Sequence, residues 1–228
     1  MFRMYCSDMK KPLRLNFKDI DPKKTLVLVV DLQNDFCHEK SVLKTKNSRN
    51  RKCALRIYDF IEKAKKMEID AVFSQQIFDE SKLTKRQKKY YSELISGKRD
   101  SFGAYEGKIN IPCVKGSFGE KYFNYNPPKD RLFIKNNFDI WQNKKLIKFL
   151  DDHRIETLLI TGVELVCCVL YAIMGAEERG FKVVIPLDLV SGVDEGVEEQ
   201  NKLLSIIGQF YGPVVSSQEI LKIWEKYY

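Results

Sequence analysis

Residues 157–180 read Thr-Leu-Leu-Ile-Thr-Gly-Val-Glu-Leu-Val-Cys-Cys-Val-Leu-Tyr-Ala-Ile-Met-Gly-Ala-Glu-Glu-Arg-Gly. The first five residues have an apolar centre, which is typical of a strand buried on both faces. Gly162 then interrupts the run, and from about Leu165 to Arg179 the apolar residues recur with a helical period. Gly180 follows at the place where a helix C-cap glycine is expected. The stretch therefore predicts a strand, a tight turn and a helix.

Two adjacent cysteines, Cys167 and Cys168, fall in the first turn of this predicted helix. The free N–H groups and the dipole at a helix N-terminus favour a thiolate over a thiol, and the same N–H groups can hold a developing oxyanion. Successive helix positions diverge by about 100°, so only one of the two can face the turn. The plain alternative is that both are core residues, since free cysteine is among the most buried residue types.

Two other predicted strands also end in a charged residue. Residues 25–30 form an apolar run followed by Asp31, and residues 131–135 form a shorter run that ends in Lys135. The carboxyl ends of parallel strands meet at one edge of a sheet, so Asp31, Lys135 and Cys168 would converge if the sheet is parallel. Taken singly, Asp31 could belong to a capping cluster, and Lys135 could reach out to solvent.

The remaining pattern alternates strands with helices. Further strands are predicted at 70–74, 182–187 and 213–215, and helices at 51–67, 81–95, 194–207 and 220–227, the last opened by a Ser216–Glu219 capping box. This order indicates a three-layer α/β/α, Rossmann-like fold with a central, mostly parallel sheet of about six strands. We interpret residues 1–228 as one domain, with a lead-in at 1–20 and a variable insertion at 80–127 that serves as a lid or an oligomer contact.

Composition narrows the class of protein. The formal charge of +8 invites a nucleic-acid interpretation, but the basic residues are spread over several segments and form no recognised module. No apolar run is long enough to span a bilayer and no signal-peptide core is present, so we expect a cytoplasmic protein with no membrane or nucleic-acid partner. The six cysteines lack zinc or disulfide-framework spacing and are expected to be free thiols.

Three motifs resemble those of the isochorismatase-like cysteine hydrolases. Residues 162–169 (Gly-Val-Glu-Leu-Val-Cys-Cys-Val) are similar to the family's nucleophile turn. Residues 31–36 are similar to its Asp-x-Gln-Asn-Asp-Phe signature, in which we expect Asn34 and Asp35 to be structural. Residues 135–141 agree in part with a third signature, Lys-x-x-Tyr-Ser-x-Phe. The resemblance covers residues from about 25 to 221.

The resemblance implies a role for each of these residues. Cys168 would be the nucleophile, Asp31 the general acid/base and Lys135 the electrostatic partner. The backbone N–H groups of Glu164 and Cys168 would form an oxyanion hole, and the Val163–Glu164 peptide bond would be cis. Candidate walls of the substrate pocket are Phe36, Phe78 and Trp141.

The chain also departs from one branch of the family. Gln76 and Phe78 occupy positions where the metal-dependent nicotinamidases carry an Asp and a His, and the only histidines are His38 and His153. We therefore expect no metal and no cofactor. Leu165 stands where threonine is common in the family, which removes a polar contact near the nucleophile.

The function implied is hydrolysis of a C–N bond in a small amide, ureide or related compound through a thioester-type intermediate. A non-catalytic binding or regulatory protein on the same fold is the alternative. Family members are commonly dimers or larger, so a homodimer or higher homo-oligomer is expected.

Overall fold

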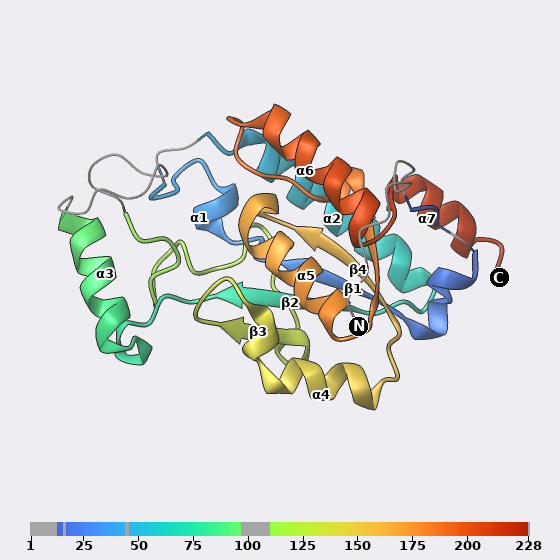
Figure 1. The fold of residues 1–228 in the computed structure, drawn as a ribbon, viewed down its shortest axis with the longest axis horizontal. Helices are drawn as coiled ribbons and strands as arrows, with labels where there is room; N and C mark the ends of the chain where they lie inside the picture. The colour runs from blue at the N-terminus through green and yellow to red at the C-terminus, as the bar shows by residue number, and fades with distance from the viewer. Residues whose placement is uncertain (1–12, 16, 44–45, 97–109, 228) are drawn as a thin grey trace.

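The fold is built on a six-stranded sheet in the computed structural model, which describes residues 13–15, 17–43, 46–96 and 110–227. The strand order is β3-β2-β1-β4-β5-β6, and every neighbouring pair is parallel. The strands are β1 (Thr25–Val30), β2 (Ala71–Gln76), β3 (Leu132–Lys135), β4 (Thr157–Gly162), β5 (Lys182–Pro186) and β6 (Val214–Val215). The predicted α/β fold with a parallel central sheet is confirmed (Figure 1).

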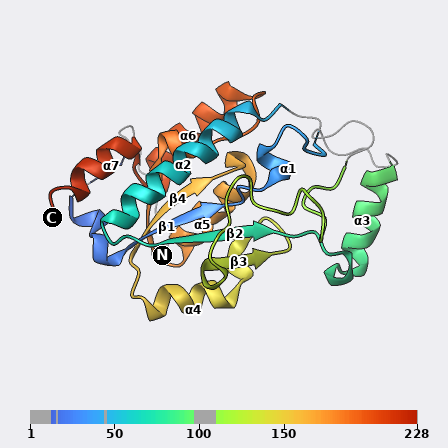
Figure 2. The ribbon, with the colours of Figure 1, turned by 180° about the vertical axis from the view of Figure 1, so that it is seen from behind.

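Helices cover both faces of this sheet. They are α1 (Asn34–Cys37), α2 (Ser48–Lys66), α3 (Lys85–Ser96), α4 (Lys144–Asp152), α5 (Leu170–Glu178), α6 (Val197–Phe210) and α7 (Ser217–Trp224). Figure 1 is viewed from the side on which α4, α5 and α6 cover the sheet. Figure 2 shows the molecule from the opposite side, where α2 and α7 lie in front of the sheet. The three layers match the architecture expected from the sequence.

The surroundings of β1 explain why residues 25–30 form a continuous apolar run. All six of its residues are buried. Val27 and Val29 pack into the core under α2, whereas Leu26 and Leu28 pack into the core under α4 and α5. A strand with a helix layer on each side has no solvent face, so its apolar run is continuous rather than alternating.

The register of the strands brings their carboxyl ends to one edge. Val30 pairs with both Ser74 and Gly162, and Gln76 at the end of β2 pairs with Lys135 at the end of β3. Asp31 follows β1 directly with a φ of 50°, in the left-handed region, and turns the chain out of the sheet. The charged residues that end the predicted strands therefore lie beside the turn that follows β4.

Several helix boundaries differ from the prediction. Helix α2 starts at Ser48 rather than 51, because Asp194 accepts hydrogen bonds from the N–H groups of Ser48 (3.1 Å) and Arg49 (2.8 Å). Asp194 is thereby used as a cap for α2, and α6 begins later, at Val197. Helix α7 starts at Ser217, with the Ser216 hydroxyl accepting from the Glu219 N–H at 3.2 Å.

Helix α3 stands apart from the sheet in Figures 1 and 2. Its one buried residue is Leu94, and Tyr91 makes an edge contact with Phe78 at a ring-centroid distance of 5.0 Å. The role of the 80–127 insertion as a lid or oligomer contact stays a prediction, and its residues 97–109 lie outside the described part. Residues 1–12 and 16 of the lead-in likewise lie outside it, and Phe17–Ile20 forms a short 3-10 turn.

Candidate active site

Three side chains meet in the interior: Asp31 directly after β1, Lys135 at the end of β3, and Cys168 in the turn that follows β4. The Lys135 Nζ lies 2.7 Å from Oδ2 of Asp31, and both of these side chains act electrostatically on the Cys168 thiol. Asp31 is 0%, Lys135 3% and Cys168 4% exposed. The structure thus brings together the three residues that the sequence nominated, in a cluster shielded from water.

Each charged member of this cluster has a second anchor. The Ser74 hydroxyl donates to Oδ1 of Asp31 at 2.6 Å, and the Lys135 ammonium donates to the Phe138 carbonyl at 3.1 Å. Ser74 was not singled out from the sequence. The available signal was its place as the last residue of a predicted strand parallel to the one that Asp31 follows. These bonds fix the carboxylate and the ammonium before any substrate arrives.

Burial and charge together set the protonation of the cluster. Burial raises the pKa of the Cys168 thiol well above its usual value, and the neighbouring Asp31 carboxylate raises it further, while Lys135 acts in the opposite direction. Burial disfavours the Lys135 ammonium, but Asp31 and Cys168 outweigh it and raise the pKa of that group. These directions favour a protonated thiol and a charged lysine in the resting site. This differs from the expectation that the helix N-terminus would favour a thiolate.

The turn that carries Cys168 is wider than the predicted α-helix. Leu165–Val169 is a π-helical turn, and α5 begins only at Leu170. The Glu164 carbonyl accepts from both Cys167 N–H (3.0 Å) and Val169 N–H (3.2 Å). Such wide turns are rare and are frequent at functional sites.

Two backbone N–H groups at this turn are candidates for an oxyanion hole. Within the described part of the chain, the Glu164 N–H has no hydrogen-bond acceptor, and the Cys168 N–H has none outside its own turn. The neighbouring Leu165 N–H is used by the Ser191 carbonyl at 2.8 Å. The Val163–Glu164 peptide bond, nominated from the sequence, is cis.

The residues after Asp31 form hydrogen bonds that hold the loop at residues 113–120 in place beside the site. Gln33 donates through Nε2 to the carbonyls of Gln76 and Glu120, both at 2.8 Å, and accepts from the Gln76 N–H. Asn34 donates to the Phe118 carbonyl at 2.9 Å, and Asp35 accepts from the Cys113 N–H at 2.7 Å. Asn34 and Asp35 act here as the structural residues that the sequence suggested.

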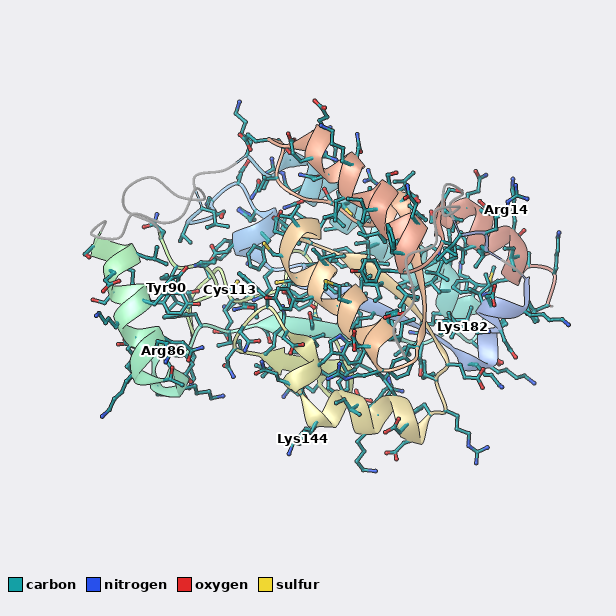
Figure 3. All side chains as sticks on the ribbon, in the orientation of Figure 1. Arg14, Arg86, Tyr90, Cys113, Lys144 and Lys182 are labelled. Carbon is teal, nitrogen blue, oxygen red and sulfur yellow. The ribbon has the colours of Figure 1, made fainter. Side chains whose placement is uncertain are left out.

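Cys113 is a further thiol beside the site, which the sequence analysis did not single out. It is fully buried, and its φ is 56° (labelled in Figure 3). Burial raises the pKa of this thiol, and the nearby Asp31, Asp35 and Cys168 raise it further. The described cysteines (Cys37, Cys53, Cys113, Cys167 and Cys168) are all free thiols, and Cys6 lies outside the described residues.

The three proposed pocket walls lie in different surroundings. Phe36 is buried in the core under α2, and Phe78 is partly buried against Tyr91. Trp141 donates its indole N–H to the Ala172 carbonyl at 3.1 Å and stacks on Phe181, so its ring is used in packing along α5. The assignment of Phe36, Phe78 and Trp141 as pocket walls stays a prediction.

At the nicotinamidase metal positions this chain presents an amide and a phenyl ring. Gln76 ends β2, and Phe78 follows it in a bridge with Val114. Among the described residues no group of three or more His, Cys, Asp and Glu side chains is arranged to hold a metal ion. Phe78 has no donor atom and Gln76 offers a single neutral amide oxygen, so these two positions supply neither the carboxylate nor the imidazole ligand of the nicotinamidase site.

Comparisons with known proteins give a consistent result. The model of the isochorismatase domain matches residues 25–219. A cysteine hydrolase from Pseudomonas syringae pv. phaseolicola superposes with a TM-score of 0.76 at 19% identity, covering 96% of this chain and 99% of that one. An isochorismatase-like hydrolase from Alkaliphilus metalliredigens gives 0.70 at 19% identity, with 88% and 99% covered.

A metal-bound relative was also found. The pyrazinamidase of Pyrococcus horikoshii, solved in complex with zinc, gives a TM-score of 0.66 at 20% identity, covering 85% of this chain and 99% of that one. No curated protein sequence matches the chain. None of the helices in the described residues is both long and apolar enough to cross a membrane.

Proposed function

Because the chain belongs to the isochorismatase family of hydrolases, we propose that it is a cysteine-dependent hydrolase of C–N bonds in a small amide, ureide or related compound. The observation that carries this proposal is the buried contact of Asp31, Lys135 and Cys168. A carboxylate, a cation and a thiol within hydrogen-bonding reach are the parts needed for nucleophilic catalysis with an adjacent base.

The first half of the reaction makes a thioester. The Cys168 thiol gives its proton to the Asp31 carboxylate as Sγ attacks the carbonyl carbon of the substrate. The N–H groups of Glu164 and Cys168 stabilise the oxyanion that forms. Asp31 then returns the proton to the nitrogen of the breaking C–N bond, and ammonia or an amine leaves.

The second half regenerates the enzyme. Water attacks the thioester carbon, and Asp31 takes one proton from it. The C–S bond breaks, the acid product leaves, and the proton passes from Asp31 to the sulfur. Lys135 remains protonated throughout, because its raised pKa keeps it charged beside Asp31. Its charge offsets the second negative charge that a thiolate would add next to the carboxylate.

The raised thiol pKa supports a base-assisted attack rather than a standing thiolate. A thiol that stays protonated at rest needs Asp31 to remove its proton at the moment of attack. The proposal therefore assigns Asp31 to every proton transfer in the cycle. No cofactor is required by these steps.

The surroundings of the nucleophile support the proposed substrate class. The buried site favours a small compound, and Leu165, which lies in the same buried apolar cluster as Cys168, makes the surroundings of the nucleophile apolar. Some of the similar solved structures are named nicotinamidase or pyrazinamidase, which are names of amidases that act on aromatic amides. One of them was solved with zinc. Since Gln76 and Phe78 are poor metal ligands, we favour amides whose binding needs no metal.

The test is a hydrolysis screen with primary amides and ureides. Ammonia release measures turnover, and acid quenching of the reaction traps any acyl group on the protein. Cys168→Ala should abolish turnover, whereas Cys167→Ala, one position away, should retain it. A mass increase of the acyl group on Cys168 in the quenched protein would identify the thioester. Equal activity of Cys168→Ala and the unaltered protein would reject the mechanism.

A second candidate is a non-catalytic binding or regulatory protein on this fold. The observation that favours it is the nearly complete burial of Asp31, Lys135 and Cys168, since a substrate must open the structure to reach them. If this candidate is correct, no member of the screen is hydrolysed and acid quenching traps no acyl group. We also propose that the protein is cytoplasmic and that it forms a homodimer or higher homo-oligomer. Sedimentation equilibrium would test the oligomeric state.

A further inference from the structure

The Glu164 side chain ties the nucleophile turn to two other segments. Its Oε1 accepts a hydrogen bond from Asn50 Nδ2 on α2 at 2.5 Å. Its Oε2 accepts from the Val193 N–H, in the segment that leads to α6, at 3.0 Å. The mechanism above uses only the backbone of Glu164, so these contacts have no role in it so far.

Both partners of this carboxylate are obligate donors. Val193 contributes a backbone N–H, which can only donate. Asn50 Nδ2 also donates to the Phe36 carbonyl at 3.0 Å, so a flipped amide would place its oxygen against a carbonyl oxygen. A carboxylate accepts from both sides, and a protonated carboxyl can do so only with its proton turned away from both partners. An amide would present a donor to one of them.

We propose that the Glu164 side chain is a positioning group for the proposed hydrolysis, which holds the nucleophile turn between α2 and the segment that leads to α6. The same residue supplies one N–H of the proposed oxyanion hole, and its carbonyl accepts the bonds that shape the π-helical turn. Fixing the side chain at both oxygens therefore fixes the peptide groups on either side of its Cα atom. This inference rests on the proposed function for its catalytic consequence, but not for its structural one.

The charge balance around Glu164 places the titration of its side chain near neutrality. Burial raises the pKa of Glu164 to about 7, against the bonds from Asn50 and Val193, which lower it. Arg49 on α2 also lowers this pKa, and Asp194 raises it. The thiols of Cys37 on α1 and Cys167 in the turn are the other titratable groups that face it. Burial holds the pKa of both thiols above the usual range, so they stay neutral in this transition.

The direct test is hydrogen exchange at the Val193 amide in the full chain between pH 5.5 and 8.5. After correction for the intrinsic rate, we expect protection in the unaltered protein to fall at least fivefold as the pH rises through the transition, because burial disfavours the charged side chain and opening of the turn lets it ionise freely. Glu164→Gln should show the low value at every pH. The control is Glu195→Gln, which makes the same change of charge at a nearby exposed position and should follow the unaltered protein.

A second variant tests the assignment of the transition itself. Asn50→Ala removes a donor that favours the charged carboxylate, so the midpoint of the protection change should move to higher pH. In a protein with measurable turnover, Glu164→Gln should also reduce kcat across the pH range. Val193 protection that is the same in Glu164→Gln and Glu195→Gln would overturn the proposal. The exchange result stands whether or not Cys168 proves to be a nucleophile, so the two proposals can fail separately.

Discussion

The ammonium nitrogen of Lys135 lies 2.7 Å from Oδ2 of Asp31, and both side chains are shielded from water. The two residues are far apart in sequence and come from strands that do not touch, since β2 lies between β1 and β3. Each supplies the countercharge that the other needs in order to remain ionised in the interior. The candidate site therefore depends on this pair both for charge and for position.

Removing one partner of the pair should destabilise the protein strongly. Lys135→Met leaves Asp31 buried beside a neutral side chain, and losses of about 3–5 kcal/mol are typical when one member of a buried pair is deleted. Urea unfolding would measure the change. Lys148→Met is the matched control, because its partner Asp152 lies at 2.8 Å on the surface of α4, where such pairs contribute at most about 1 kcal/mol. Similar losses in both variants would contradict the burial argument.

Neutralising Asp31 should make Cys168 more reactive toward a small alkylating agent. The Asp31 carboxylate raises the pKa of the Cys168 thiol, and Lys135 lowers it, so Asp31→Asn leaves only the lysine to act. Iodoacetamide should label Cys168 faster in Asp31→Asn than in the unaltered protein at pH 7.5, while turnover is lost. Peptide mass spectrometry separates Cys168 from Cys167. Slower labelling in the folded variant would show that Asp31 acts in alkylation mainly as the base that removes the thiol proton, and would contradict this prediction.

The close approach of Gly119 to Asp35 should make this position intolerant of any side chain. A Cβ atom at Gly119 would lie 1.8 Å from the Asp35 carboxylate, which is itself held by Val42 and Cys113 N–H groups. We expect Gly119→Ala to cost at least about 2 kcal/mol, in the range of overpacked positions. Thermal unfolding would measure it.

Gly116→Ala is the comparison for this prediction. Its φ of 78° disfavours a side chain, but nothing lies within 4 Å of the added atom. Backbone strain alone should cost about 1 kcal/mol. If both alanine variants unfold at the same temperature, the contact with Asp35 does not limit position 119.

Glu164 should give the stability of the protein a measurable dependence on pH. Its folded-state pKa of about 7 lies above its ordinary value of 4.5 because burial disfavours the charge. Between these two values the folded state binds more protons than the unfolded state, so this group's contribution to stability is present below pH 4.5 and is lost as the pH rises through 7. Glu164→Gln removes the titration, so its unfolding free energy should change less between pH 5 and 7.5. Parallel curves for the two proteins would contradict the shift.

Short-range patterns in the sequence predict most of the fold. The apolar run at 25–30 and the stretch at 157–180 predicted central strands because strands with a helix layer on each side need apolar residues at every position. The charges at Asp31 and Lys135 then indicated where the strands end. These features depend only on neighbouring residues, so they can be read without knowing the rest of the structure.

The sequence did not indicate contacts that join distant segments. The start of α2 is set by Asp194, which caps the helix although it lies far along the chain. The hydrogen bond between the Ser74 hydroxyl and the Asp31 carboxylate depends on the register of β1 and β2. The protonation of Cys168 is likewise a tertiary property. The helix N-terminus favours a thiolate locally, but burial and the approach of Asp31 dominate once the chain is folded.

The sequence by itself determined the order of strands and helices and nominated Asp31, Lys135 and Cys168, because periodicity and strand ends are local properties of the chain. Only the tertiary structure decided how these groups are charged, which side chains hold them, and that Glu164 is clamped between Asn50 and Val193. The physical reason is that burial and electrostatic interaction depend on every group packed nearby, and packing brings together residues that no local pattern connects.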